Sequence, residues 1–359
     1  MRDIKTVGLI LAGGSGSRFW PLSRKKLPKQ VLKLTGDKEM INVTIDRCNS
    51  FIAGEDMHII TNKDLKGLLE DIVSDRIPFN NIFAEPCGRN TAPCLLYSAM
   101  KLKKKYGDAV VCVFSADHSI KDEETFRGVI EKGVTYAQPF DGIVTIGIVP
   151  TFPSTGYGYI KKGEAKENAL VFFEVDQFVE KPDIETAEHY IATGQYLWNS
   201  GMFIFKLSTI LNRFEKYLPD MFNALEEIEK VINTPEEEKL LNKIYPTLER
   251  ISFDYGIMEK EQQLAVIPGE FGWSDIGAWN TLEDILPLDE RNNIIQGEHI
   301  GIDTKDCVIF GDKLIATIGL SDIVIVSTAD SILVCHKDRV QDIKKLTDEL
   351  EKRNRTDLL

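Results

Sequence analysis

The sequence has few of the features that would mark a membrane, secreted or nucleic-acid-binding protein. No segment approaches the ~20 consecutive apolar residues of a membrane helix. Six cysteines include no CxxC pair, and the chain is far longer than disulfide-stapled secreted domains. Lys and Arg number 43 against 56 Asp and Glu, and this net charge of -13 argues against nonspecific nucleic-acid binding. We expect a cytoplasmic protein with reduced, mostly buried thiols, no membrane span and no nucleic-acid partner.

Apolar runs alternate with helical patterns over residues 5–150. The predicted strands are TVGLILA, MHIIT, NIFAEP, AVVCVFSADH and GIVTIGIVP, and helices are predicted over residues 38–52, 63–75 and 90–106. This alternation predicts an α/β, Rossmann-like domain whose mixed, mostly parallel sheet is covered on both faces. Ligands bind beyond the carboxyl ends of the strands in such sheets.

The second half of the chain departs from this alternation. Residues 151–290 mix strand patterns with helices rich in Glu and Lys, which we interpret as an elaboration of the same sheet. Residues 291–335 carry short strands with turn residues at short spacing, and a helix is predicted over about 336–353. The sequence therefore predicts a domain of residues 1–290 and a small β-rich, β-helix-like module with a closing helix at residues 291–359.

The stretch LAGGSGSRFWPLSRKKLPKQ, residues 11–30, opens a run of six basic residues from Arg18 to Lys33 without one acid. The dinucleotide fingerprint fails because Phe19 replaces its third glycine, and the Walker Gly-Lys-Ser/Thr is absent. A glycine loop whose backbone N–H groups approach a polyphosphate, with Arg18 supplying further donors, remains. A glycine turn followed by a solvated basic face is the alternative. The candidate loop residues are Leu11, Ala12, Gly13, Gly14, Ser15 and Gly16.

This stretch resembles the signature of the sugar-1-phosphate nucleotidylyltransferases, and it is most similar to that of the mannose-1-phosphate guanylyltransferases. EPCGRNTAP, SADH, TGYGYI, FVEKP, WNSGMF, DYGIMEK and FGWSDIGAW continue the resemblance in order over nearly the whole chain. It implies a GT-A type nucleotidyltransferase domain that transfers GMP from GTP to mannose 1-phosphate with Mg²⁺. Larger members add a phosphomannose isomerase domain after the β-rich tail, so with the last residue at Leu359 we expect no isomerase activity.

The resemblance also assigns the groups that handle phosphate and metal. Arg18 is expected at the triphosphate, Lys29 of the PKQ motif at the reacting phosphates, and Asp117 and Asp275 as the magnesium ligands. From the residues alone, Lys29 could instead be an exposed loop lysine, and each aspartate could be a turn or helix-capping residue. His118 is expected as a hydrogen-bonding neighbour, because no zinc-type partners accompany it.

Nucleotide recognition is expected in AEPCGRNTAP. Glu85 can accept hydrogen bonds from guanine N1–H and N2–H, with Arg89 and Asn90 near the ribose or phosphate. Alternatively, Asn90 serves only to cap the following helix.

Sugar recognition is expected in the later motifs. Glu180 can accept hydrogen bonds from sugar hydroxyl groups, and Lys181 can pair with phosphate. The Asn199 amide can both donate hydrogen bonds to the sugar and accept them from it. The resemblance places the backbone of Gly156 against the sugar. Asp254 and Lys260 match a family motif, but their role does not follow from the sequence.

Two other functions stay open at this point, and a third is disfavoured. The same chemistry could act on another sugar 1-phosphate, such as a manno-heptose, or on another nucleotide. A catalytically silent homologue could bind a nucleotide sugar and regulate a partner. A nicotinamide dehydrogenase is contradicted by Phe19. Because uncovered strand edges invite pairing, we expect a homodimer or a higher homo-oligomer.

Overall fold

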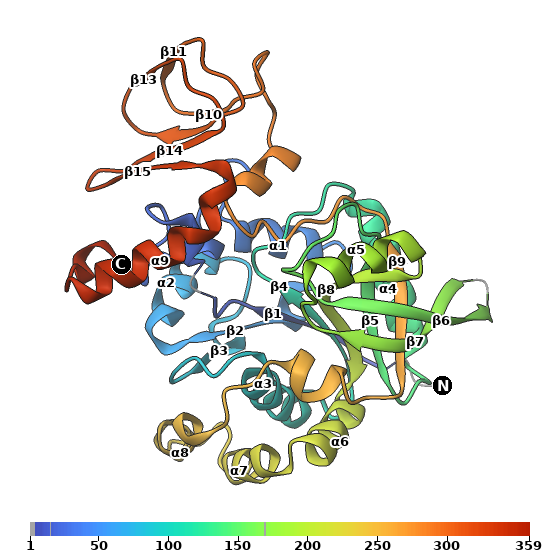
Figure 1. The fold of residues 1–359 in the computed structure, drawn as a ribbon. Helices are drawn as coiled ribbons and strands as arrows, with labels where there is room; N and C mark the ends of the chain where they lie inside the picture. Colours follow the sequence, from blue (N-terminus) through green and yellow to red (C-terminus); the bar gives the residue numbers. More distant parts are fainter. Residues whose placement is uncertain (1–3, 15, 169) are drawn as a thin grey trace. The chain divides into compact units, whose positions relative to one another are not determined.

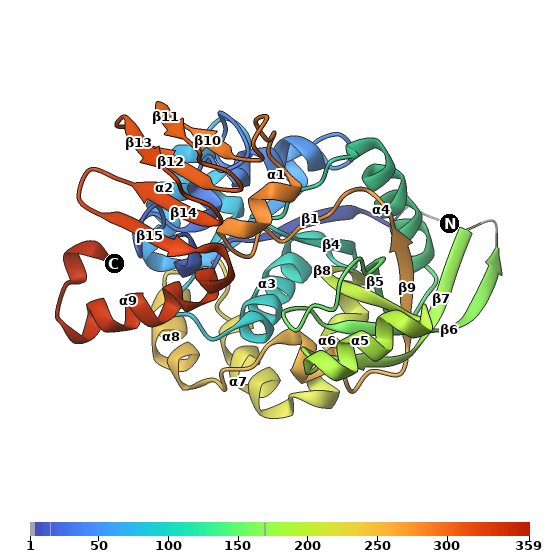
Figure 2. The same ribbon diagram turned by 45° about the horizontal axis from the view of Figure 1, so that its top comes forward.

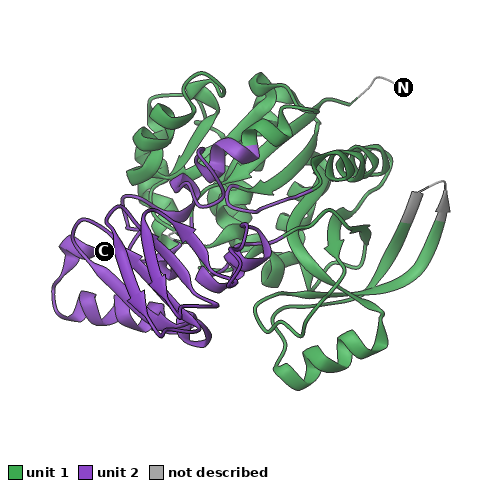
Figure 3. Cartoon of the chain, turned by 90° about the horizontal axis from the view of Figure 1, so that it is seen from above, with its two compact units in different colours: residues 1–13, 45–115, 122–273 green, residues 14–44, 116–121, 274–359 purple. Residues whose placement is uncertain are grey.

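A computed structural model of the chain describes residues 4–14, 16–168 and 170–359 and divides them into two compact units (Figure 3). Unit 1 comprises residues 1–13, 45–115 and 122–273, and unit 2 comprises residues 14–44, 116–121 and 274–359. Ser15, one of the predicted loop residues, lies outside the described residues. The domain boundary predicted after residue 290 is not tested by this division and stays a prediction.

Unit 1 is built on a nine-stranded sheet with the order β3-β2-β1-β4-β8-β5-β9-β7-β6. In the described part of the chain, β7 and β8 run opposite to the other strands of this sheet, which confirms a mixed, mostly parallel sheet. Residues 151–290 do extend the same sheet. The strands are β1 Thr6–Leu11, β2 Met57–Asn62, β3 Ile82–Glu85, β4 Val110–Ser115, β5 Ile143–Ile148, β6 Tyr159–Asn168, β7 Leu170–Val179, β8 Tyr196–Lys206 and β9 Leu264–Gly269.

Helices cover both faces of this sheet (Figure 1). One face packs on α3, α6, α7 and α8 through a large apolar core, whereas α4 packs on β4, β5, β8 and β9 from the opposite side. The helices predicted over 38–52, 63–75 and 90–106 are confirmed as α1, α2 and α3. Their bounds are α1 Met40–Cys48, α2 Lys63–Val73, α3 Thr91–Tyr106, α4 Glu123–Ala137, α5 Ile184–Thr193, α6 Leu207–Tyr217, α7 Pro219–Glu229 and α8 Glu236–Ile244.

Unit 2 contains the predicted β-rich module (Figure 2). Parallel strands β10, β12 and β14 form a sheet that antiparallel β15 extends, while β11 and β13 pair in parallel in a second sheet. This recurrence of parallel pairs from successive segments is the β-helix-like pattern that the sequence predicts. The bounds are β10 Ile294–Gln296, β11 His299–Ile302, β12 Val308–Gly311, β13 Ile315–Ile318, β14 Ile323–Ser327, β15 Ile332–His336 and α9 Ile343–Lys352.

The module shares one core with the segment that follows the glycine loop. Phe19 is fully buried and its ring lies 5.1 Å from that of Trp279, which contacts Phe310 in turn. The Trp20 indole N–H donates to the Leu358 carbonyl at 2.7 Å. Residues 14–44 therefore belong to the same compact unit as the C-terminal strands.

All six cysteines are free, and Cys48, Cys94, Cys112 and Cys307 are buried. Over the described ranges, no helix is both long enough and apolar enough to cross a bilayer.

Candidate active site

Lys29 is the central cation of a polar cluster in unit 2. Its side chain is only 5% exposed, and its ammonium group lies 2.9 Å from a carboxylate oxygen of Asp117. The same ammonium group donates to the backbone carbonyl of Asp275 at 2.6 Å. Lys29 is therefore not the exposed loop lysine that the sequence also allowed, and it joins the two aspartates expected as metal ligands.

The segments that carry these aspartates lie side by side. Ser119 and Ser274 exchange two backbone hydrogen bonds of 2.9 and 3.0 Å, which fixes residues 117–119 against residues 274–275. Asp117 does not cap the next helix, because the Asp122 side chain accepts from the Thr125 N–H there. The Asp117 side chain is therefore not the N-cap of α4.

The charge state of Asp117 follows from its surroundings. Burial disfavours the carboxylate, but the opposite charge of Lys29 and the neighbouring His118 outweigh burial and hold the pKa of Asp117 below its ordinary value. Asp117 is therefore ionised at neutral pH, which also agrees with His118 as an interacting neighbour.

The two aspartates suit magnesium only with help from a substrate. Among the described residues, no group of three or more His, Cys, Asp or Glu side chains could hold a metal ion by itself. Magnesium commonly takes one or two protein carboxylates and completes its shell with phosphate oxygens and water. The oxygen donors of Asp117 and Asp275 fit that pattern if a polyphosphate supplies the other ligands.

The glycine loop enters this cluster through Gly16. Gly16 has a φ of 59°, and a Cβ atom there would lie 2.2 Å from Cβ of Lys29. Gly16 thus permits close approach to the Lys29 backbone, whereas the sequence suggested close approach to a phosphate. Gly14 faces open space within the described part of unit 2, and the Arg18 side chain is exposed. These two positions leave room for a ligand.

Leu11 is the last residue of β1 in unit 1, and Ala12 and Gly13 follow it. The Ala12 N–H donates to Ile60 and its carbonyl accepts from the Thr61 hydroxyl, so the Ala12 backbone is occupied by β2. A Cβ atom on Gly13 would lie 3.4 Å from a carboxylate oxygen of Glu85. Gly13 therefore opens the space beside the predicted base reader.

Glu85 ends β3 and is 5% exposed. Burial raises the pKa of Glu85 to about 7, although the Tyr245 hydroxyl, which donates to its carboxylate, opposes the rise. A buried carboxyl group with one donor retains acceptor capacity for further N–H groups.

Arg89 and Asn90 have structural partners in unit 1. The Arg89 guanidinium donates to the Pro246 carbonyl, next to Tyr245. The Asn90 side chain accepts from the Thr91 N–H at 2.8 Å and caps α3. Asn90 therefore caps α3, and a binding role for either residue stays a prediction.

The predicted sugar-binding residues form a second polar cluster in unit 1. The Glu180 side chain is 8% exposed, and its carboxylate lies 2.9 Å from the Lys181 ammonium group. The Asn199 amide donates to a carboxylate oxygen of Asp254 at 2.9 Å. A Cβ atom on Gly158 would lie 2.5 Å from Glu180 and 3.4 Å from Cβ of Asn199, so Glu180 and Asn199 both border Gly158. Gly156 lies just before this cluster, and its N–H donates to the Ser154 hydroxyl.

Asp254 is the member of this cluster whose role the sequence did not reveal. Burial, and then the negative charge of Glu180, raise the pKa of Asp254 to about 6, while Asn199 and Lys181 oppose the rise. Its motif, DYGIMEK, was the only signal in the sequence. Its neighbours Asn199 and Glu180 become visible only in the fold.

Two family models match the chain. Residues 7–292 match the family model described as nucleotidyl transferase, and residues 297–350 match the MannoseP isomerase/GMP-like beta-helix domain. The chain is thus a nucleotidyltransferase by class.

Individual relatives narrow the class. The chain is 38% identical over 98% of its length to the mannose-1-phosphate guanylyltransferase of Escherichia coli K12, covering 74% of that protein. A crystal structure from Thermus thermophilus, described as a mannose-1-phosphate geranyltransferase, shares 33% identity with a TM-score of 0.87 over 97% of this chain and 100% of that chain. One from Helicobacter pylori, described as a mannose-6-phosphate isomerase, shares 25% identity with a TM-score of 0.62 over 76% of this chain and 100% of that chain. The chain belongs to the mannose-1-phosphate guanylyltransferase branch of the nucleotidyl transferase family.

Proposed function

We propose that this chain transfers GMP from GTP to α-D-mannose 1-phosphate, forming GDP-mannose and pyrophosphate. The observation that carries the proposal is the buried Lys29 ammonium group, which contacts both the Asp117 carboxylate and the Asp275 carbonyl. A buried cation beside potential metal ligands suits a reaction between two polyanions.

The reaction requires an oxygen of the sugar phosphate to attack the α-phosphorus of GTP. One P–O bond forms there, the bond from the α-phosphorus to the β-bridging oxygen breaks, and its electron pair leaves with pyrophosphate. Lys29 and Arg18 would reduce the repulsion between the phosphates and stabilise negative charge on the reacting group. This step needs positioning and positive charge and no covalent enzyme intermediate.

Asp117 and Asp275 would hold Mg²⁺ when the polyphosphate is present. The ion would supply further positive charge to the phosphate oxygens. The ionised state of Asp117, which Lys29 favours, is the state that a magnesium ligand requires.

Glu85 would select guanine. The N1–H and N2–H groups of guanine are donors that favour the ionised carboxylate, so bound guanine should lower the pKa of Glu85 from its raised value of about 7. The sugar cluster would bind mannose 1-phosphate, with Lys181 toward phosphate and with Glu180 and Asn199 toward hydroxyl groups. Asp254 would orient the Asn199 amide.

The test is pyrophosphate release from a grid of four nucleoside triphosphates and several sugar 1-phosphates, with magnesium and with chelator. We expect release with GTP and mannose 1-phosphate that the chelator abolishes. Preference for another pair would move the substrate assignment, and no release with any pair would favour a regulatory homologue.

We also propose that the C-terminal strands form a contact between subunits. Large apolar side chains are exposed on β11, β13 and β15, which is unusual for strands that face water. They are Ile300 at 58%, Ile302 at 56%, Ile318 at 74%, Ile332 at 67% and Val334 at 62% exposure. A homodimer would cover these side chains.

A cytoplasmic location stays a prediction.

A further inference from the structure

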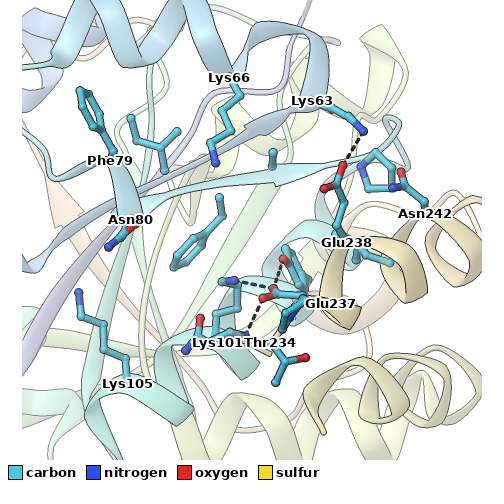
Figure 4. A pocket seen from close by; sticks show the side chains of 18 residues that line it. Lys63, Lys66, Phe79, Asn80, Lys101, Lys105, Thr234, Glu237, Glu238 and Asn242 are labelled. Carbon is cyan, nitrogen blue, oxygen red and sulfur yellow. Dashed lines mark hydrogen bonds and ion pairs between the residues drawn. The ribbon is translucent and has the colours of Figure 1, made fainter. Parts of the chain in front are cut away.

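A pocket in unit 1 involves none of the residues assigned to the proposed reaction (Figure 4). Its volume is about 870 Å³, within the range of small-molecule sites. Its walls come from α2, the loop before β3, α3 and the segment leading into α8. The pocket is therefore formed by several elements and is not a shallow feature of one helix.

The pocket wall is basic although the chain is acidic. Four lysines and two glutamates line it, so positive charges exceed negative ones by two. The glutamates neutralise only two of the lysines: Lys63 lies 2.8 Å from Glu238, and Lys101 lies 2.5 Å from Glu237. The other two lysines, Lys66 and Lys105, lack such close carboxylate partners among the described residues.

Lys66 and Lys105 extend into the same open space from α2 and α3 (Figure 4). Lys66 has Glu70 at 3.6 Å, beyond hydrogen-bond distance, and Lys105 donates to the neutral Asn81 side chain at 2.7 Å. Burial lowers the pKa of Lys105, and the more distant charges of Asp56 and Glu55 only partly oppose that effect. An anion between these two ammonium groups would supply the missing negative charge.

An aromatic side chain also lines the pocket. Phe79 is 56% exposed and borders the pocket together with Asn80 (Figure 4). An exposed aromatic ring offers a stacking surface for a planar or apolar group, and the Asn80 amide can donate and accept. The volume also exceeds what an inorganic anion alone would fill.

We propose that this pocket binds a small organic phosphate, with its phosphate between Lys66 and Lys105 and its organic part against Phe79. The binding does not depend on the proposed catalytic function. Adenosine monophosphate is a suitable probe, because it carries one phosphate and a planar base while differing from the proposed guanine substrate.

Lysine acetylation followed by mass spectrometry localises the binding. We expect adenosine monophosphate to slow acetylation of Lys66 and Lys105 severalfold, with no change at Lys132, an exposed lysine on α4. Equal acetylation rates at Lys66 and Lys105 with and without the nucleotide would overturn the proposal.

Titration calorimetry then tests the contacts. The Lys66→Glu/Lys105→Glu variant should bind adenosine monophosphate about tenfold more weakly or worse, as expected for loss of a charge-assisted hydrogen bond, and Lys132→Glu should not change the affinity. Phe79→Ala should weaken the binding of adenosine monophosphate but not that of inorganic phosphate. The proposal is contradicted if the double variant, folded by circular dichroism, keeps the wild-type affinity.

Discussion

Replacing Lys29 by methionine tests the phosphate cluster while keeping most of the side-chain volume. The change removes the ammonium group that lies 2.9 Å from Asp117. Loss of one positioned group that stabilises transition-state charge costs about 10²–10³ in kcat, or about 3–4 kcal/mol. We therefore expect Lys29→Met to lower pyrophosphate release by that factor.

The same change has a smaller effect on folding. Removing one partner of a fully buried ion pair costs ~3–5 kcal/mol. The Asp117 side chain is 32% exposed, so water can partly replace the lost cation. We therefore expect the free energy of unfolding, measured with urea, to fall by ~1–3 kcal/mol. The variant should remain folded, with an Asp117 pKa above the wild-type value.

Lys25→Met is the matched control in the same unit. Lys25 is 63% exposed and pairs with Glu351 at 2.9 Å, and such surface pairs contribute only about 0–1 kcal/mol. Both unfolding and turnover should stay near wild type. A folded Lys29→Met protein with near-normal kcat and KM would refute the assignment of Lys29.

Three further predictions follow from other parts of the chain. Because the folded-state pKa of Glu85 is raised from 4.5 to about 7, the folded protein binds more protons than the unfolded chain between these values. The free energy of unfolding of the wild type should therefore fall relative to that of Glu85→Gln as the pH rises through this window, by up to ~3 kcal/mol. Urea unfolding at a series of pH values measures this difference. Parallel pH curves for the two proteins would contradict the raised pKa. Gly158→Ala places a Cβ atom 2.5 Å from Glu180 and should raise the KM for mannose 1-phosphate about tenfold, whereas Gly128→Ala, in open space on α4, should not. Ile318→Glu should convert a dimer to monomers, because it places a charge where the β-rich module has its most exposed large apolar side chain. Analytical ultracentrifugation measures the mass. An unchanged mass would exclude this face as the subunit contact.

The sequence predicted five strands and three helices of residues 5–150 from their apolar periods, but it gave no bounds for α4. Gly107, with a φ of 72°, follows α3 directly and ends the helix predicted over residues 90–106. The strands of the β-rich module were also recognisable from their short apolar runs. The sequence predicted a β-helix-like module there, whereas the structure shows which of its strands pair in parallel.

Contacts between distant segments could not be predicted in this way. The packing of Phe19 on Trp279 joins residues far apart in the chain, so no local pattern shows that residues 14–44 belong with the C-terminal strands. The hydrogen bond from Tyr245 to Glu85 has the same origin, and it adjusts the pKa of a residue predicted for a different reason. The motifs predicted which residues belong to the site, and the fold shows which of these residues are in contact.

In the proposed reaction, an oxygen of the sugar phosphate attacks the α-phosphorus of GTP. Mass spectrometry of the products formed from mannose 1-phosphate carrying ¹⁸O in its phosphate oxygens shows whether this bond forms. We expect GDP-mannose that retains all of the label and pyrophosphate that contains none. Label in pyrophosphate, or the absence of GDP-mannose, would contradict the proposed reaction.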